Sequence, residues 1–594
     1  RNGNIEIDFT PFRTGKISLE KAEVKNNKAY SYQITFYGDI LSLKDKFSND
    51  KLVDLTWLNI FKHEYTGTEV LNRTIDGTTN YVLRYPLIVG RDVTYGDGGS
   101  TDINPVTGTG AIHYDELFPA IRLAAILGAM QAKYLVTFQG TFLTDKRFQN
   151  AYLHCQNADT FVFNTPPTLA DFTTLYTDPS NNNTSLTASD FFDVTEETLT
   201  ISQFNVPANF PNPTGSNGIY GGAKHTISVS IQNVSDTTIT YYTDIHINGQ
   251  LFQTIEGVGN GVQQAQLIPN STLNTPRVFT FFVRSTASLT LDLFVTYVQE
   301  AKYQYENAFF IPQQEILRNY FDAKASYAIT AEISVVNYLP DMTVESFFAG
   351  ILKMFNLTCY GIEADVYQVE PLSDWYDKGA VVDITKYTDI ESINVDRVKL
   401  FRNVEFKYQE SESATNTIFR DLTSRGYGNT SENFDYDGGD FKVEVPFENM
   451  MQQKFANTNL QIGETINTDG NRYTPKPLIL YQYDQLAAAW SFNDGAHTTQ
   501  SQYVPFGQDL IDTNINYTLN FNADISTLLN QTVPNTLFSV YYQSYLGNLY
   551  NLKNRETTVK TNLPISLLTN LKLNDRLIIR DKRFSINSMS SNLT

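Results

Sequence analysis

Residues 289–297, Leu-Thr-Leu-Asp-Leu-Phe-Val-Thr-Tyr, decide the fold class, because an apolar residue stands at every second position from Leu289 to Tyr297. Successive side chains of a β-strand point to opposite faces of a sheet, so this spacing predicts a strand with one buried face. Residues 226–231 alternate in the same way. Asn248-Gly249 separates two further strand-like runs, which is a strong signal for a β-hairpin. This part of the chain is therefore predicted to be sheet.

The surrounding segment, residues 191–305, contains short strand patterns and turns and almost nothing helical. A series of short strands at this spacing favours a β-sandwich. A stretch rich in Asn, Thr, Ser, Pro and Gly (175–220) leads into it, and helix-containing patterns resume after it. We therefore interpret 191–305 as a β-sandwich inserted into another domain.

The flanking sequence mixes strands with a few helices. A β-strand is predicted for 30–38, and 93–110 is a loop rich in Gly, Thr and Asp. A helix is predicted to begin at Pro119, since proline is tolerated in a first turn. A second helix, residues 344–355, has apolar residues at spacings of three and four, with Thr343 as its N-cap.

The composition supports a mainly β fold with a few helices (α+β) and several domains. Hydrophobic residues make up 41% of the 594 residues and aromatic residues 13%, which is ample for buried cores. The 36 Tyr and 39 Phe suit half-buried strands, because their flat rings pack well on a pleated surface.

The charge balance argues against specific binding of nucleic acid. The chain has 44 Lys and Arg against 64 Asp and Glu, for a formal net charge of −20. Nucleic-acid affinity rests on neutralisation of phosphates by basic side chains, and in this chain the acidic side chains outnumber the basic ones. The acidic balance serves solubility, and it also suits a wall past which DNA slides without binding.

Two cysteines, Cys155 and Cys359, are too few for a disulfide framework or a cysteine-rich zinc site. No apolar run is long enough to span a membrane, so we expect no transmembrane segment. The first residues have no signal-peptide pattern.

No catalytic motif stands out, so we predict that the chain is not an enzyme and has no catalytic, cofactor-binding or metal site. The phosphate-binding, nucleophile-elbow and dinucleotide fingerprints are missing. The six histidines (His63, His113, His154, His225, His246 and His497) show no pair at metal-ligand spacing. They are interpreted as ordinary surface or core histidines, and no cofactor is expected.

Three local patterns each allow a functional and a structural interpretation. Asp435–Asp440 is similar to a calcium loop, but Pro446 stands where the bidentate carboxylate belongs, which favours a solvated turn. Gly257–Gly261 could cradle a phosphate, but no helix follows, which favours a strand connection. Tyr220 and Tyr241 are candidates to bind carbohydrate from the sandwich, whereas aromatic residues in a sandwich more often belong to its core.

Several segments, taken in order, resemble the hub proteins of bacteriophage tails (baseplate hub or tail-tip hub), especially those of long-tailed phages of Bacteroidetes-type hosts. No single segment is specific, and the resemblance rests on the ordered set, which covers most of the chain outside 191–305. The segments are residues 32–39, 115–122, 337–355, 369–376, 401–408, 424–428 and 573–579.

The resemblance implies a structural protein of the virion, assembled in the host cytoplasm. It implies a homotrimeric ring with barrel-like tube domains, which continues the tail tube and lets DNA pass. The implied partners are tail tube or distal tail proteins, the tape-measure protein, and spike or fibre proteins. The inserted sandwich, which a basic hub does not need, is a candidate to contact host glycans.

On this basis the chain divides into five segments. They are an N-terminal tube-like β domain (1–110), a helix-strand segment of the hub core (111–190), the inserted β-sandwich (191–305), the continued hub core (306–410) and a C-terminal β domain (411–594). The competing hypothesis is a secreted or cell-surface protein that binds or degrades glycans. Tape-measure and tube genes beside the gene favour the hub, whereas polysaccharide-utilisation genes favour the alternative.

Overall fold

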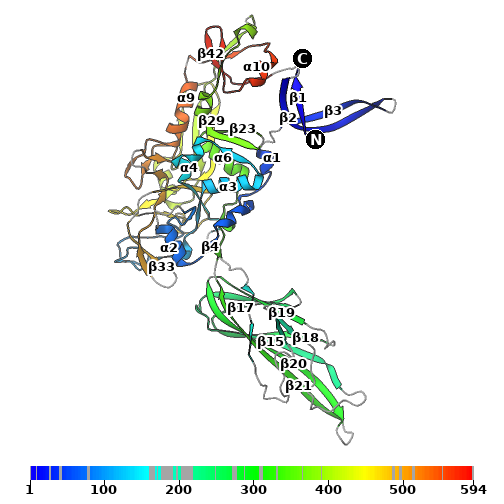
Figure 1. The fold of residues 1–594 in the computed structure, drawn as a ribbon. Coiled ribbons are helices and arrows are strands. Elements are labelled where there is room, and N and C mark those ends of the chain that lie inside the picture. The colour runs from blue at the N-terminus through cyan, green and yellow to red at the C-terminus, as the bar shows by residue number, and fades with distance from the viewer. Residues whose placement is uncertain are drawn as a thin grey trace. The chain divides into compact units, whose positions relative to one another are not determined.

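The computed structural model is mainly β, with several sheets and few helices, as the composition predicts. It forms two compact units (Figure 1). Unit 1 comprises Arg1–Lys62, Gly67–Phe161 and Ser334–Thr594, and unit 2 comprises His63–Thr66 and Val162–Ile333. The residues that the structure describes are 2–7, 10–25, 28–38, 43–75, 81–158, 168–169, 172–175, 192–195, 198–201, 218–247, 249–270, 277–286, 288–306, 312–329, 332–363, 365–389, 391–483, 488–493, 498–511, 515–551 and 553–590.

Unit 2 contains two β-sheets. The six-stranded sheet has the order β13 (Phe192–Thr195), β14 (Thr198–Ile201), β19 (Arg277–Ser285), β16 (Thr240–Ile247) and β17 (Gln250–Val258), with β11 (Thr168–Leu169) also on β19. The five-stranded sheet has the order β12 (Phe172–Leu175), β21 (Pro312–Ile329), β20 (Leu289–Glu306), β15 (Gly218–Gln232) and β18 (Gly261–Asn270). Neighbouring strands are antiparallel throughout both sheets.

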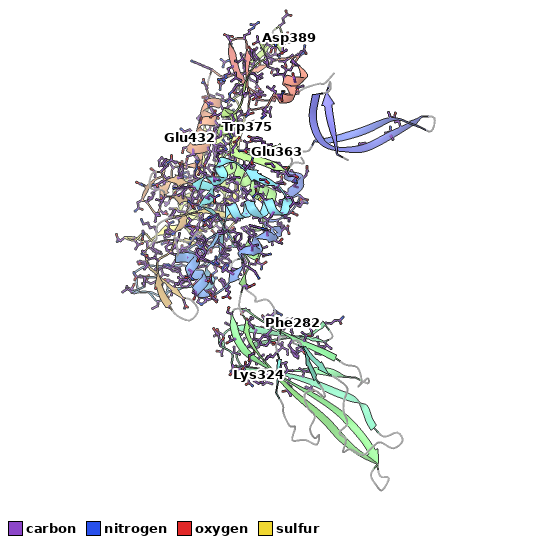
Figure 2. All side chains as sticks on the ribbon, viewed as in Figure 1. Phe282, Lys324, Glu363, Trp375, Asp389 and Glu432 are labelled. Carbon is purple, nitrogen blue, oxygen red and sulfur yellow. The ribbon has the colours of Figure 1, made fainter. Side chains whose placement is uncertain are left out.

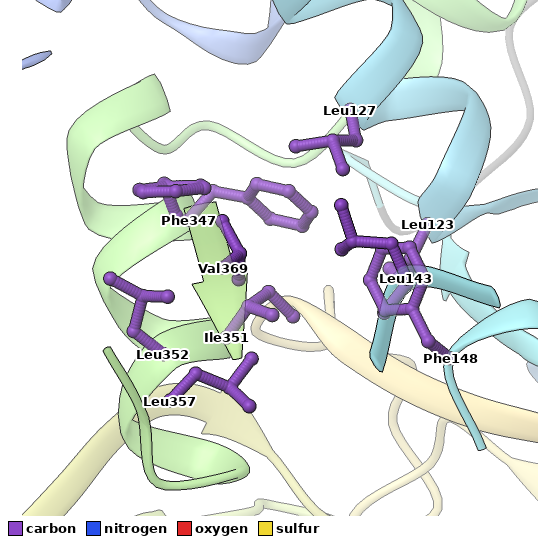
Figure 3. Close-up of a pocket in the computed structure, with 10 residues that line it drawn as sticks. Leu123, Leu127, Leu143, Phe148, Phe347, Ile351, Leu352, Leu357 and Val369 are labelled. Carbon is purple, nitrogen blue, oxygen red and sulfur yellow. The ribbon is translucent and has the colours of Figure 1, made fainter. Parts of the chain in front are cut away.

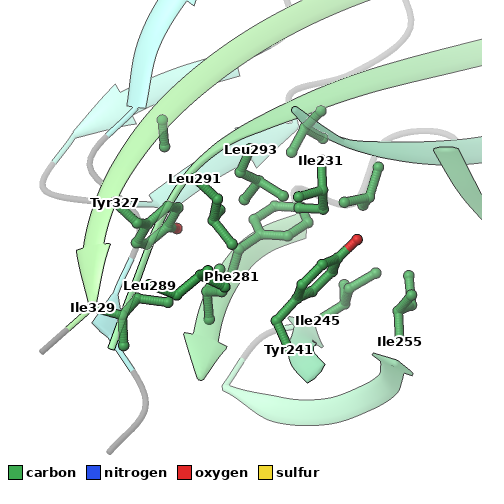
Figure 4. Packing of buried hydrophobic residues seen from close by; sticks show 14 of the residues in the cluster. Ile231, Tyr241, Ile245, Ile255, Phe281, Leu289, Leu291, Leu293, Tyr327 and Ile329 are labelled. Atoms are coloured by element: carbon green, nitrogen blue, oxygen red, sulfur yellow. The ribbon is translucent and has the colours of Figure 1, made fainter. Parts of the chain in front are cut away.

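The core of unit 2 lies between these sheets, which makes it a β-sandwich (Figure 4). The five-stranded sheet contributes the alternating apolar residues predicted from the sequence, such as Val229 on β15 and Leu291 on β20. The six-stranded sheet contributes Ile245 and Phe281, which are fully buried. The alternation in the sequence therefore identified the face that packs on the opposite sheet.

The one charged residue within 289–297, Asp292, lies on the opposite face of β20. Its carboxylate accepts hydrogen bonds from Ser326 Oγ (2.5 Å) and Asn233 Nδ2 (2.6 Å), and Lys324 Nζ lies 2.9 Å away. Figure 2 labels Lys324 among the side chains of unit 2. The hydrogen bonds from Ser326, Lys324 and Asn233 together lower the pKa of Asp292 to about 2. The charged residue therefore has partners and does not disturb the strand.

The structure places the limits of unit 2 outside the 191–305 expected from the sequence. Both expected limits fall within the unit, which runs from Val162 to Ile333 and includes His63–Thr66. At the C-terminal end, β20 and β21 pair along their whole length, from Leu289↔Ile329 to Glu306↔Pro312. The expected limit at 305 therefore falls within β20, and β21 belongs to the same sheet as its full-length neighbour.

Unit 1 is organised around an eight-stranded mixed sheet. Its order is β28 (Thr430–Asn433), β27 (Asn403–Gln409), β29 (Asp440–Glu448), β32 (Leu478–Gln482), β10 (Ala151–His154), β8 (Ala120–Arg122) and β5 (Leu83–Arg84), with β35 (Phe506–Gly507) also on β32. A buried cluster that includes Tyr152, Leu480 and Phe506 joins these strands. The limits expected at 110 and 410 therefore do not separate compact units, because this sheet joins strands from both sides of each limit, and the limit expected at 190 falls within unit 2.

Two helices flank this sheet region, α3 (Leu123–Tyr134) and α6 (Val344–Met354). The prediction that a helix begins at Pro119 was wrong. Residues Ala120–Arg122 instead form the buried strand β8, which pairs with β10 and β5, so the helix begins at Leu123. Helix α6 follows its prediction closely, and its N-cap Thr343 accepts a hydrogen bond from Ser346 N at 3.1 Å.

The other α-helices that the structure describes have ten residues or fewer, and the other strands form sheets of two or three strands. The remaining α-helices are α1 (Leu43–Phe47), α2 (Gly67–Ile75), α4 (Lys146–Gln149), α7 (Leu372–Asp377), α8 (Ala414–Thr423), α9 (Gln543–Leu549) and α10 (Ile565–Asn570). The small sheets combine β1 (Asn2–Ile7), β2 (Thr10–Lys25) and β3 (Lys28–Gly38); β4 (His63–Glu64) and β22 (Glu332–Ile333); β23 (Leu357–Glu363), β24 (Val366–Pro371) and β9 (Thr137–Gln139); β25 (Val381–Asp383), β41 (Arg576–Ile579) and β42 (Lys582–Ser585); β26 (Asn394–Arg397) and β40 (Arg555–Thr558); β30 (Gln453–Lys454), β31 (Gln461–Glu464) and β6 (Ile88–Val89); β34 (Thr498–Ser501), β33 (Trp490–Asn493) and β7 (Ile112–His113); β36 (Asp509–Leu510) and β37 (Tyr517–Thr518); and β38 (Ile525–Ser526) and β39 (Gln531–Thr532).

Candidate functional site

Tyr241, one of two residues considered for carbohydrate binding, belongs to the core of the sandwich. Its side chain is only 2% exposed, and its hydroxyl donates a hydrogen bond to the carbonyl oxygen of Gly259 at 2.7 Å. A buried ring cannot stack on a sugar, so the carbohydrate interpretation was wrong for Tyr241. The side chains of Tyr220 and His225, and His497 as a whole, lie outside the described residues.

Both glycine-containing motifs form turns. Gly257–Gly261 connects β17 to β18, with Gly259 at a φ of +65°, as its interpretation as a strand connection predicts. In the Asp435–Asp440 motif, Gly438 N donates to the carbonyl oxygen of Leu400 at 2.7 Å. A Cβ atom at Gly438 would lie 2.1 Å from that oxygen, so the turn requires glycine there.

Within the described ranges, no group of three or more His, Cys, Asp or Glu side chains could hold a metal ion.

The buried histidine and the cysteines are held in their neutral forms. Burial lowers the pKa of His154 to about 4, and its Nε2 lies 3.2 Å from Gln156 Oε1. Burial also raises the pKa of the Cys155 thiol far above its ordinary value and that of Cys359 to about 12. Thiols with raised pKa values are poor nucleophiles at neutral pH. His154 and Cys155 are therefore interior residues, whereas Cys359 is half-buried.

An apolar cavity of about 10 Å³ lies in unit 1 between α3 and α6 (Figure 3). Its lining is Leu123, Leu127, Leu143, Phe148, Phe347, Phe348, Ile351, Leu352, Leu357 and Val369. An apolar cavity of this size has no polar group to orient a ligand and scarcely holds one water molecule. It is a gap in core packing.

A second cavity, of about 20 Å³, is polar and lies where β6 approaches the 113–118 turn and the residues after β31. We call this region the polar corner; its lining is Ile88, Gly90, Asp115, Glu116, Phe118, Gln156, Thr465 and Arg472. Arg91 Nε donates to Glu116 Oε2 at 2.6 Å, and Arg472 Nε donates to the Gly90 carbonyl oxygen at 2.7 Å. The cavity matches one water molecule, and these charged groups have partners within the chain.

Glu464, at the end of β31, lies beside the polar corner. The residue is only 7% exposed. Burial raises its pKa to about 7, with a further contribution from the charge of Asp92, against a hydrogen bond from the backbone N–H of Val93. Its protonation therefore changes near neutral pH. The sequence held no signal for this residue, because both causes depend on tertiary structure.

The adjoining loop, residues 93–110, is ordered around the carboxylate of Asp102. That carboxylate accepts hydrogen bonds of 2.8 Å from the backbone N–H groups of Gly96, Gly98 and Asn104, and from Thr107 Oγ1. Burial acts to raise the pKa of Asp102, but these hydrogen bonds outweigh it and leave the pKa lowered. The loop therefore has a fixed shape, and its residue Val106 is 87% exposed.

Chemically, the polar corner and its loop can present a defined contact surface. The described residues there do not place a nucleophile against a general base, and the acidic and basic side chains are used in internal ion pairs and hydrogen bonds.

Comparison with protein-family models and a search of curated proteins both gave no match. Among the helices in the described part of the chain, none is long and apolar enough to cross a membrane.

Proposed function

We propose that the chain is a structural hub protein of a bacteriophage tail tip or baseplate. It would form a homotrimeric ring that continues the tail tube, joins the tube to spike or fibre proteins, and lets DNA pass. Distal tail and tape-measure proteins would be its other neighbours. In this role the chain contributes contact surfaces and a channel wall and performs no catalysis.

The observation that carries the proposal is the assembly of the resembling segments into one unit. Residues 115–122 and 401–408 lie on opposite sides of the insertion in the sequence, yet β8 and β27 belong to one sheet. Helix α6, from segment 337–355, packs in the same unit: the centroid of its Phe348 ring lies 5.1 Å from that of the Phe138 ring. A hub core interrupted by a sandwich requires this arrangement, because its halves must fold together.

A cryo-electron microscopy map of the virion tail tip tests the proposal. The expected result is density for unit 1 in a ring on the tail axis, between the tube and the spike. A map in which this chain is missing from the axis would contradict the hub function, even if the chain decorated the outside of the virion.

The alternative, a glycan-binding protein, has its best support in unit 1. The ring centroids of Phe434, Tyr436 and Tyr550 lie 5.1–5.9 Å from one another beside the exposed residues Asp435 and Asp437. Aromatic rings and carboxylates are groups that contact sugars. Loss of polysaccharide binding in a Tyr436→Ala variant, together with polysaccharide-utilisation genes beside the gene, would favour this alternative over the hub.

A further inference from the structure

Strand β17 is the terminal strand of the six-stranded sheet in unit 2. It pairs with β16 from Thr240↔Val258 to Ile247↔Gln250, and no strand in the described part of unit 2 pairs with its other side. The outer side of such a strand presents alternating N–H and C=O groups to whatever lies next to it. Another extended backbone matches this spacing of donors and acceptors.

The sequence of β17 lacks the features that usually protect an edge strand. It has nine residues, no proline, no lysine and a single charged residue, Glu256. By contrast, β28, at the edge of the eight-stranded sheet, has four residues, all polar, and β26 contains both Asp396 and Arg397. Short strands and charged residues prevent pairing with other chains. Among these three strands, β17 is therefore the one most open to pairing.

A β-bulge limits the usable edge to one part of β17. The register with β16 shifts between Ile245 and His246, which leaves Phe252 as the extra residue. Bulges bend a strand and interrupt its ladder. The regular part of the edge is therefore Gln253–Val258.

Exposed apolar side chains lie at both ends of this regular edge. Leu251 is 59% and Phe252 40% exposed at its start. Val258 is 54% exposed at its end, and Val262 is 70% exposed just across the turn at Gly259. An added strand would find apolar contacts at both ends and backbone partners between them, which is how strand addition combines specificity with affinity.

We infer that β17 binds an extended segment of a partner protein by strand addition along Gln253–Val258. Apolar side chains near the two ends of the segment contact Leu251 with Phe252 and Val258 with Val262. The formal charge of −20 per chain disfavours a second copy of this protein as the occupant and favours a neutral or basic segment. The inference stands on unit 2 alone and goes beyond the hub function, so either can fail without the other.

The first test uses the full chain and a synthetic peptide, Lys-Val-Thr-Val-Thr-Val-Lys, with blocked termini. In hydrogen–deuterium exchange, the outward amides of Gln253–Val258 should exchange fast in the free chain and slowly with the peptide. Two further peptides carry N-methyl groups on alternate residues, one on the valines and one on the threonines. Since alternate N–H groups of a strand face its neighbour, one methylated peptide should bind about tenfold more weakly and the other should bind like the parent.

Several results would overturn the inference. They are equal binding of all three peptides, no binding of the parent peptide at millimolar concentration, protection that maps to another strand, and amides of Gln253–Val258 that are all protected already in the free chain. The last result would mean that the chain's own residues fill the edge.

Variants of exposed residues test the apolar contacts. Leu251→Lys and Val258→Lys should each weaken binding of the parent peptide about fivefold, because each removes apolar contact and adds a like charge. Val395→Lys is the matched control, since Val395 is 59% exposed on β26 of unit 1; it should leave the affinity unchanged. A concentration-dependent doubling of the 67.2 kDa mass that Val258→Lys abolishes would instead assign the edge to a second copy.

Discussion

Glu464 has a charge state that changes close to neutral pH, because burial and the nearby charge of Asp92 raise its pKa to about 7. The pKa is 4.5 without these influences. The folded protein therefore holds the proton more tightly than the unfolded chain does. Ionisation of Glu464 therefore lowers the free energy of unfolding. This loss of stability is absent below pH ~4, grows between pH ~4.5 and ~7, and is complete above that range.

We predict that Glu464→Gln raises the free energy of unfolding above pH 7 by up to about 3 kcal/mol and has little effect near pH 4. The uncharged amide keeps an oxygen that can accept the hydrogen bond of Val93. Calorimetric melting temperatures of both proteins between pH 4 and 8 measure the difference. Asp92→Asn should reduce the pH dependence of the Glu464 protein, and parallel melting curves for wild type and Glu464→Gln would contradict the prediction.

Phe348 tests the buried face of α6. Its ring centroid lies 5.1 Å from that of Phe138 and 5.7 Å from that of Phe47. We predict that Phe348→Asp destabilises the fold by several kcal/mol and greatly lowers soluble expression, because it buries a charge without a partner. Lys353→Gln, on the exposed side of the same helix, is the control. A soluble Phe348→Asp protein with an unchanged melting temperature would mean that this face of α6 is not core.

Which helices and strands form depends on a competition between local sequence preferences and pairing with strands distant in the sequence. Helix α6 follows its apolar spacing and its Thr343 cap, since both act within a few residues. The expected helix start at Pro119 fails because β8 gains partners on two sides, β10 and β5. Sheet pairing with distant segments outweighed a local preference for a first helical turn.

The sandwich provides a prediction at the same scale. A fragment covering Val162–Ile329 should fold alone, because the core that joins its two sheets lies entirely within that range. The expected result is a β-type circular dichroism spectrum and a single cooperative melting transition. A fragment covering 191–305 is the matched comparison and should be unfolded or aggregated, because it lacks β21. Equal stability of the two fragments would contradict the importance of β21.

For the whole molecule, the net charge of −20 bears on the proposed channel. We predict a homotrimer of about three times 67.2 kDa whose channel wall is net negative or neutral. Wall charges act on a duplex within the Debye length of about 8–10 Å, and a basic lining would bind its phosphates and retard ejection. Light scattering measures the mass, and the tail-tip map measures the lining. A monomer in solution and in the virion, or a lumen lined mainly by Lys and Arg, would contradict the prediction.

Local sequence patterns were sufficient to predict the fold class, the strands with alternating apolar residues, helix α6 and a β-rich segment within the chain. These features depend on periodicities of two and 3.6 residues, which neighbouring positions express. Tertiary structure alone decided the limits of unit 2, the burial of Tyr241, the strand β8 and the raised pKa of Glu464. Each depends on segments far apart in the sequence, as when Asp92 acts on Glu464, and no local pattern records which distant residues will become neighbours.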